Sequence, residues 1–122
     1  MQNGRHAVSI DERRCYFRNN LWEKERPGQN IKRVWFAGVH SAVGGSYSPD
    51  RSGLSQIALE WMLCEAASFG LMVDPDRAKH VLGYLPAPPL HPADLKQPIH
   101  DSLTWAWWIL EFLPHQFYDL GR

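Results

Sequence analysis

This 122-residue sequence has few cysteines, no excess of positive or negative charge and no long apolar run. The two cysteines, Cys15 and Cys64, match no disulfide scaffold and no metal spacing. The richest apolar stretch, residues 103–113, is shorter than the ~20 residues of a bilayer span and contains Glu111. The N-terminus lacks the apolar core of a signal peptide. We therefore expect a soluble chain made in the cytoplasm, with later export left open.

Charge is balanced, with 13 basic and 13 acidic residues. This balance argues against nucleic acid or an anionic membrane surface as a partner. No motif implies a cofactor, since the glycines at 44–45 fit neither common phosphate-loop pattern. The histidines outside the central motif share no ligand-like spacing, which argues against a metal site; they are His80, His91, His100 and His115.

The length permits one domain, residues 1–122, and is too short for two. Six tryptophans in so short a chain each need a large apolar partner surface. Nine prolines, most of them in the second half, imply much irregular backbone. Together these features suggest that the chain packs against something else.

A strand is predicted within residues 31–39. Its core, Val34–Val39, is short, apolar and rich in β-branched and aromatic residues, which is typical of a strand buried on both faces of a parallel sheet. Upstream, the apolar residues at 7, 8 and 10 indicate a brief helix or strand, and Pro27-Gly28 indicates a turn.

Two principal helices are expected. The first spans residues 54–69, with Ser52 as N-cap, Gly70 as stop and Cys64 on the buried face. A short helix is predicted from Pro75 to His80, capped by Asp74. Residues 84–100 are expected to be irregular. The second principal helix begins near residue 101 or 102 and ends at Pro114, and its nearly continuous apolar surface predicts burial.

His40 directly follows the predicted strand and opens a loop rich in small residues. Reactive groups in open α/β sheets lie at the carboxyl ends of strands, where a neutral imidazole can act as a general base. The alternative is a structural histidine, which is the commoner case for a lone histidine after a strand. Gly44 and Gly45 permit positive φ or close backbone approach, and Tyr47 offers a hydroxyl near the same rim. Asp11 and Glu12 beside Arg13 and Arg14 suggest either a buried ion-pair cluster or exposed surface pairs.

Residues 34–47 (VWFAGVHSAVGGSY) resemble the "VWFPGVHSDVGGGY" signature of an α/β-hydrolase-fold family that includes the phospholipase effectors of type VI secretion systems. Residues 54–62 (LSQIALEWM) are similar to the "LSDIALEWM" helix of that family. Residues 6–14 (HAVSIDERR) resemble its "HALALDERR" segment, and residues 99–103 (IHDSL) resemble its "IHDSL" segment. The resemblance follows the chain in order from near its start to near its end.

The resemblance implies a Ser–Asp–His triad that hydrolyses lipid or other ester substrates, with His40 as the histidine. It implies that Gly38, Ser41, Gly44, Gly45 and Tyr47 shape the loop or contact substrate. The sequence contains no G-x-S-x-G, so an upstream segment or a partner chain would supply the serine and aspartate. The expected fold is therefore α/β, the C-terminal fragment of an α/β-hydrolase fold with one or two strands, two main helices and long loops.

Three positions depart from the signature. Ala37 replaces the usual proline, Ser46 the frequent glycine, and Ala42 the usual aspartate two residues after the histidine. The alternative to part of an enzyme is therefore a catalytically dead remnant or a small protein-interaction module.

Overall fold

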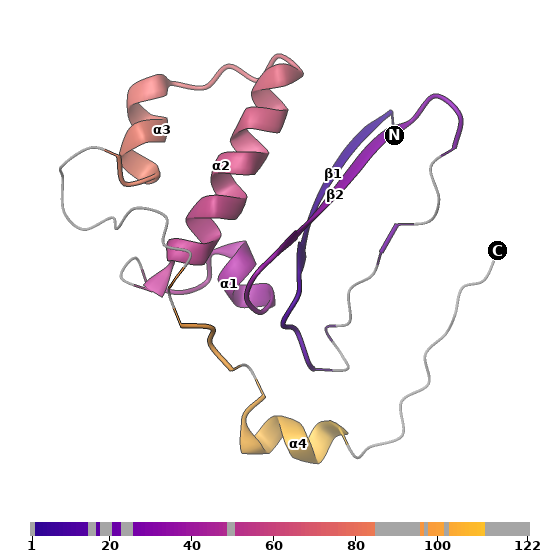
Figure 1. The fold of residues 1–122 in the computed structure, drawn as a ribbon, viewed down its shortest axis with the longest axis vertical. Coiled ribbons are helices and arrows are strands. Elements are labelled where there is room, and N and C mark those ends of the chain that lie inside the picture. Colours follow the sequence, from indigo (N-terminus) through magenta and orange to yellow (C-terminus); the bar gives the residue numbers. More distant parts are fainter. Residues whose placement is uncertain are drawn as a thin grey trace.

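Two parallel strands form the sheet in the computed structural model of the protein, which describes residues 2–14, 17, 21–22, 26–48, 51–84, 96, 98–101 and 103–111. Strand β1 spans Asn3–Ser9 and strand β2 spans Asn30–Phe36. Asn3 pairs with Asn30 and Ser9 with Phe36. Because the strands run in the same direction, their carboxyl ends lie together, next to the short helix α1 (His40–Gly44; Figure 1).

Strand β2 lies where the sequence predicted a strand, but its ends and its burial differ from the prediction. β2 begins one residue earlier than expected and ends at Phe36, three residues before Val39. Phe36 is buried, whereas Trp35, whose side chain alternates to the other face of the strand, is 50 % exposed. The expectation of burial on both faces is therefore wrong for the described part of the chain. The brief element expected near residues 7–10 is β1.

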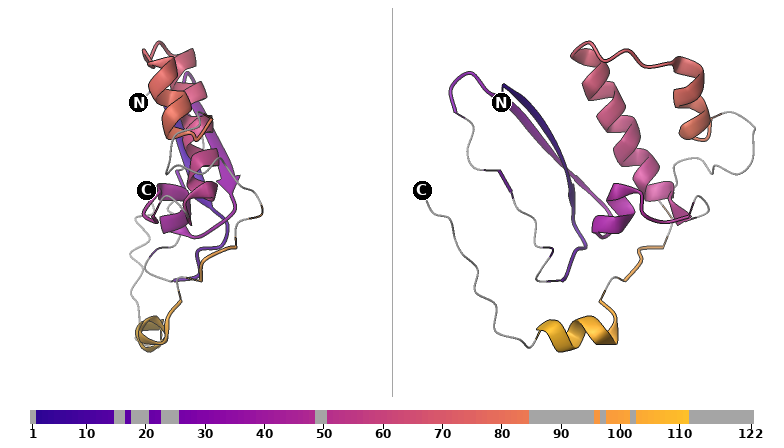
Figure 2. Two further views of the ribbon diagram at one scale, coloured as in Figure 1. Left: turned by 90° about the vertical axis from the view of Figure 1, so that its left-hand side faces the viewer. Right: turned by 180° about the vertical axis from the view of Figure 1, so that it is seen from behind.

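Helix α2 (Gly53–Ser68) confirms the predicted long helix and lies against one face of the sheet (Figures 1 and 2). Its Trp61 ring packs at a tilt against the Phe36 ring, with centroids 5.5 Å apart. Nearer its C-terminus, Glu65 accepts hydrogen bonds from Arg5 on β1, at 2.5 Å, and from Lys32 on β2. Arg5 and Lys32 are register partners, so one carboxylate ties the helix to both strands.

Helix α2 begins and ends close to the predicted residues, but the predicted burial of its side chains is less accurate. Ser52 occupies the N-cap position but its side chain makes no cap hydrogen bond, and Gly70 follows the helix with φ +92°. Cys64, expected on the buried face, is exposed. This expectation is wrong because no described residue covers that side of α2 at Cys64.

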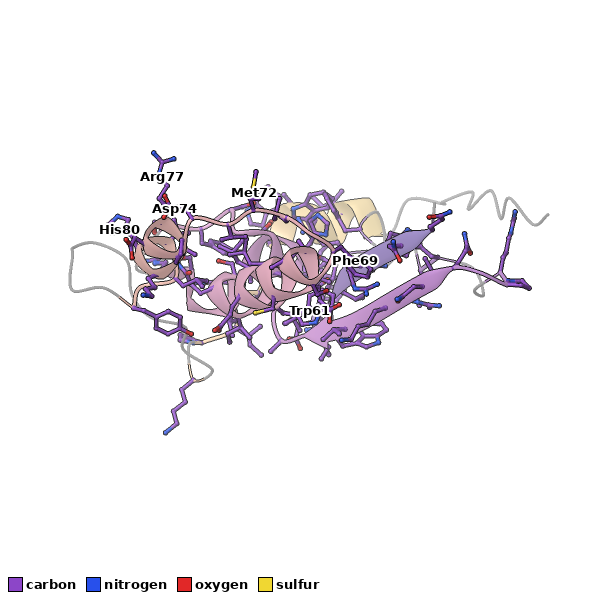
Figure 3. All side chains as sticks on the ribbon, turned by 90° about the horizontal axis from the view of Figure 1, so that it is seen from above. Trp61, Phe69, Met72, Asp74, Arg77 and His80 are labelled. Carbon is purple, nitrogen blue, oxygen red and sulfur yellow. The ribbon has the colours of Figure 1, made fainter. Side chains whose placement is uncertain are left out.

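Helix α3 (Pro75–Val81) forms as its cap predicts. The Asp74 carboxylate accepts hydrogen bonds from the backbone N–H groups of Asp76 and Arg77, at 3.0 and 3.1 Å. Pro75 occupies the first turn, where its missing N–H costs nothing. Seen from above, Arg77 and His80 project away from α2, and Met72 in the preceding connection also points outward (Figure 3).

Helix α4 (Trp105–Glu111) is shorter and more exposed than predicted. It begins several residues after position 101, and it lies apart from α2 and α3 in all three ribbon views (Figures 1 and 2). Trp105 is 78 % exposed and Ile109 58 %. The predicted burial is wrong here because no described element covers this face of α4. The predicted end at Pro114 and most of the irregular stretch 84–100 lie outside the described residues.

The hydrophobic core is small and lies at the carboxyl end of the sheet. Its centre is formed by Val39, Ala42 and Leu54, with Tyr47 and Ile57 packed against it. No helix in the described part of the chain is long and apolar enough to cross a membrane. Within the described residues, two parallel strands, one long helix and three short ones make a small α/β arrangement, consistent with a partial α/β-hydrolase fold.

Candidate functional site

Hydrogen bonding between the two chain segments continues past the ends of the strands. The Ile10 N–H donates to the Phe36 carbonyl at 3.0 Å, and the Asp11 N–H donates to the Gly38 carbonyl at 3.2 Å. In return, the Gly38 N–H donates to the Asp11 carboxylate at 2.6 Å. Gly38 is thus held through both of its backbone polar groups by a single residue that follows β1.

Gly38 turns the chain from β2 into α1. Its φ of +107° is one that residues with a side chain rarely adopt. Val39 is then buried at the N-cap, and its carbonyl accepts the first bonds of the helix from the N–H groups of Ala42 and Val43. His40 is therefore the first residue of a helix, four residues after the strand, and not the first residue of a loop as predicted. Its side chain is exposed.

Glu12 reaches the start of this helix from the β1 side. Its Oε2 accepts a hydrogen bond from the His40 N–H at 3.1 Å. The same carboxylate accepts two bonds of 2.8 Å from the Arg14 guanidinium and one of 3.1 Å from the Arg14 N–H. The Glu12 side chain is fully excluded from solvent and that of Arg14 is 10 % exposed. For Glu12 and Arg14, the buried alternative of the predicted ion-pair cluster is confirmed.

These bonds set the acidity of Glu12. Burial alone would raise the pKa of its carboxyl, but the bonds from the Arg14 guanidinium and from the N–H groups of Arg14 and His40 lower the pKa to about 2 from the usual 4.5. The group is therefore ionised throughout the physiological range, as a charge-assisted acceptor must be.

Acid should weaken the folded state through this group. A depressed pKa in the folded chain contributes stability that is complete above the unfolded pKa, near 4.5, and is lost as pH falls toward about 2. We expect the free energy of unfolding, measured in urea, to fall by about 2 kcal/mol over that window after solvent screening is allowed for. Glu12→Gln should flatten the dependence. It should not abolish it, because Lys32 and Arg5 also lower the pKa of Glu65. An unchanged pH dependence in Glu12→Gln would contradict the assignment.

Two aromatic rings, those of Phe17 and Trp107, lie against the Arg14 side of the Glu12–Arg14 pair. The Arg14 guanidinium lies over the Phe17 ring, 4.0 Å from its centroid, and 5.1 Å from the Trp107 ring of α4. Phe17 packs edge-on against Trp107 at 5.6 Å, and its ring lies 5.8 Å from the His40 imidazole. Two otherwise exposed segments thus meet at the ion pair beside His40.

The other predicted loop residues differ in what they do. Gly45 ends α1 in the left-handed region, φ +79°, and its N–H donates to the Ser41 carbonyl. Gly44, predicted to share this role, has no positive φ and is helical. Tyr47 packs on the core and stacks on His100 at 4.2 Å. The segment around residue 100 is thereby brought to the same end of the sheet, and the buried His100 Nε2 has no partner among the described residues.

Ala42 lies in the core, 2 % exposed. A Cβ added to Gly38 would meet the Ala42 Cβ at 2.9 Å, so the turn and the helix are in close contact here. The position where the resembled signature has aspartate is therefore filled by a small apolar side chain against Val39 and Leu54.

No described side chain is hydrogen-bonded to the His40 imidazole, and Asp11 reaches only the Gly38 backbone. In the same residues, no three His, Cys, Asp or Glu side chains are placed to share a metal ion. His80 lies exposed on α3, and His91 and His115 lie outside the described residues. The roles of Asp11, Glu12 and Arg14 at the His40 turn were not predicted from the sequence, although charged residues directly after a strand end are a usable signal.

The fold and site define part of an α/β-hydrolase-like domain with a histidine turn at the carboxyl end of its sheet. The profile described as "T6SS, Phospholipase effector Tle1-like, catalytic domain" matches residues 1–65, which include β1, β2, α1 and most of α2. The chain belongs to this family of phospholipase effector catalytic domains.

One similar curated protein is the uncharacterized protein YEL023C of Saccharomyces cerevisiae, 46 % identical over 44 residues. The alignment covers 34 % of this chain and 6 % of the yeast protein, so the chain matches only a small part of that relative's length. No solved structure matches the chain.

Proposed function

We propose that residues 1–122 are the C-terminal, histidine-bearing portion of an α/β-hydrolase-like catalytic domain, acting within a serine-type ester hydrolase on phospholipid or related esters. The observation that carries the proposal is the placement of His40. It lies in the segment matched by the family, at the carboxyl end of a parallel pair, with an exposed side chain and a backbone held by Glu12.

In this proposal His40 is the general base. It takes the proton of a serine hydroxyl during attack on the ester carbonyl and returns a proton to the leaving group. Gly38 and Gly45 supply the two left-handed turns on either side of α1, and Ser41, Gly44 and Tyr47 complete the loop. The serine and the aspartate come from an upstream segment or a partner chain, since no G-x-S-x-G occurs in the sequence.

The purified 122-residue chain should not hydrolyse esters by itself, because removing the nucleophile leaves at most a small residual rate. The measurement is release of fatty acid from phosphatidylcholine vesicles and of nitrophenol from a short-chain ester, compared with His40→Ala. Both proteins should equal the buffer blank. Hydrolysis by the parent chain that disappears in His40→Ala would overturn the requirement for an external serine.

The native product tests the hydrolase assignment itself. An antibody against this chain should precipitate from source cells a protein, or a pair of proteins, in which a fluorophosphonate probe labels a serine. Boiled precipitate is the control for non-specific labelling. A precipitate that contains this chain but takes up no probe would contradict the proposal.

The second candidate is a catalytically dead remnant or protein-interaction module. The observation that favours it is the exposure of large apolar side chains: Trp35, Phe69, Leu71, Met72, Trp105, Trp108 and Ile109. Trp105, Trp108 and Ile109 share one face of α4 by their helical spacing, and contiguous exposed apolar surface of this kind usually marks contacts with other proteins. Under this candidate the precipitated product has the size of this chain alone and takes up no probe.

A further inference from the structure

The N-cap residue of α1 provides no side-chain acceptor for the free N–H groups at the start of the helix. The first N–H groups of a helix have no intrahelical acceptor, and polar N-cap side chains usually supply one. Val39 occupies the N-cap here and makes no side-chain cap bond. The His40 N–H instead donates to Glu12, 28 residues earlier in the chain. The helix that carries His40 is therefore capped from the β1 side.

The Glu12 carboxylate is held in place by Arg14. Both of its carboxylate oxygens accept from the Arg14 guanidinium at 2.8 Å, which gives the bidentate geometry that restricts both side chains. Arg14 in turn lies against the Phe17 and Trp107 rings, which also contact each other. Because Phe17 also lies 5.8 Å from the His40 imidazole, the same unit contacts the backbone of His40 and neighbours its ring.

We propose that Glu12, held by Arg14, is the positioning residue for His40: it fixes where α1 begins and thereby the direction in which the imidazole leaves the backbone. The catalytic meaning of this role rests on the proposed function of His40. Glu12 acts through the His40 backbone and touches no substrate. Asp11 does the same for the preceding turn by holding the Gly38 N–H at 2.6 Å.

The test uses the intact 122-residue chain and needs no catalysis. Amide hydrogen exchange at His40 is followed by NMR in the parent, Glu12→Ala and Glu12→Gln, together with the rate at which diethyl pyrocarbonate modifies His40. We expect exchange about tenfold faster in Glu12→Ala, the loss expected for one charge-assisted hydrogen bond, with Glu12→Gln between the two. The modification rate should change in the same order.

Glu65→Gln is the matched control. Glu65 is also a largely buried carboxylate with two cationic partners, but it contacts β1 and β2 and not His40. Glu65→Gln should lower global stability while leaving exchange and modification at His40 within about twofold of the parent, because local opening at α1 does not involve that pair. Exchange at His40 that is unchanged in the Glu12 variants, or accelerated equally by Glu65→Gln, would overturn the proposal. If Glu12→Ala does not fold, Glu12→Gln against Glu65→Gln decides the question by the same comparison.

This outcome is separable from that of the proposed function. If the native product takes up no fluorophosphonate while the His40 amide responds to Glu12, the hydrolase assignment falls and the contact stands. If the product is labelled and the amide does not respond, only the positioning role falls.

Discussion

Gly38→Ala is expected to destabilise the chain by about 3 kcal/mol, a large fraction of the stability of a small domain. Two costs combine. The φ of +107° is unfavourable for any residue with a Cβ. The added methyl group would also lie 2.9 Å from the Ala42 Cβ and 3.2 Å from the Leu54 Cδ1, where the packed core cannot yield without moving α1 against α2. Urea unfolding followed by tryptophan fluorescence measures the change.

Gly28→Ala separates the two costs. Gly28 has φ +86°, but a Cβ there would meet nothing within 4 Å. It should therefore cost about 1 kcal/mol, from backbone strain alone. Equal losses for the two variants would show that Gly38 is not in tight contact with the core. In a third variant, Gly38→Ala combined with Ala42→Gly, part of the packing cost should be recovered.

Ala42→Asp, which restores the aspartate of the resembled signature, should also cost about 3 kcal/mol. The introduced carboxyl would replace a side chain that is 2 % exposed and packed against Val39 and Leu54. An ionised carboxylate without a hydrogen-bonding partner is strongly disfavoured there. Because burial raises the pKa of such a carboxyl, the loss should shrink as pH falls from 7 toward about 4, the pKa of an aspartate in the unfolded chain. Thermal and urea unfolding at pH 7 and pH 4 measure both effects.

Ser46→Gly is the matched control, since it restores another signature residue at an exposed position. It should change the free energy of unfolding by less than about 0.5 kcal/mol. An Ala42→Asp variant as stable as the parent would mean that α1 can rearrange to expose the new carboxylate. The core position of Ala42 would then be only one of two accessible arrangements.

Elements whose causes are local could be predicted closely from the sequence. The apolar spacing that starts at Leu54 and the glycine at position 70 gave α2 to within a residue or two, and Asp74-Pro75 gave α3. In each case the signal and the hydrogen bonds that satisfy it lie within one or two helical turns.

The end of β2 and the start of α1 could not be predicted because their causes are distant in sequence. β2 ends at Phe36 because Gly38 turns toward Asp11, and α1 starts at His40 because Glu12 accepts its N–H. A valine at the N-cap gives no local signal of a helix. The position directly after a predicted strand made His40 a candidate, but the Glu12 carboxylate that accepts its N–H and the Asp11 carboxylate that holds Gly38 became apparent only in three dimensions. The exposure of α4 likewise depends on tertiary partners that no periodicity encodes.

The parallel pairing also has a consequence for synthesis on the ribosome. Asp11 and Gly38, which join the two segments, are 27 residues apart, so β1 leaves the exit tunnel well before the strand it pairs with. At roughly 5–20 residues per second the delay is on the order of seconds, long compared with chain collapse. For that interval a nascent chain carries β1 without β2, Asp11 without Gly38, and Glu12 with Arg14 but without the His40 N–H. During those seconds β1 is an unpaired strand whose free backbone N–H and C=O groups are open to pairing with another extended chain.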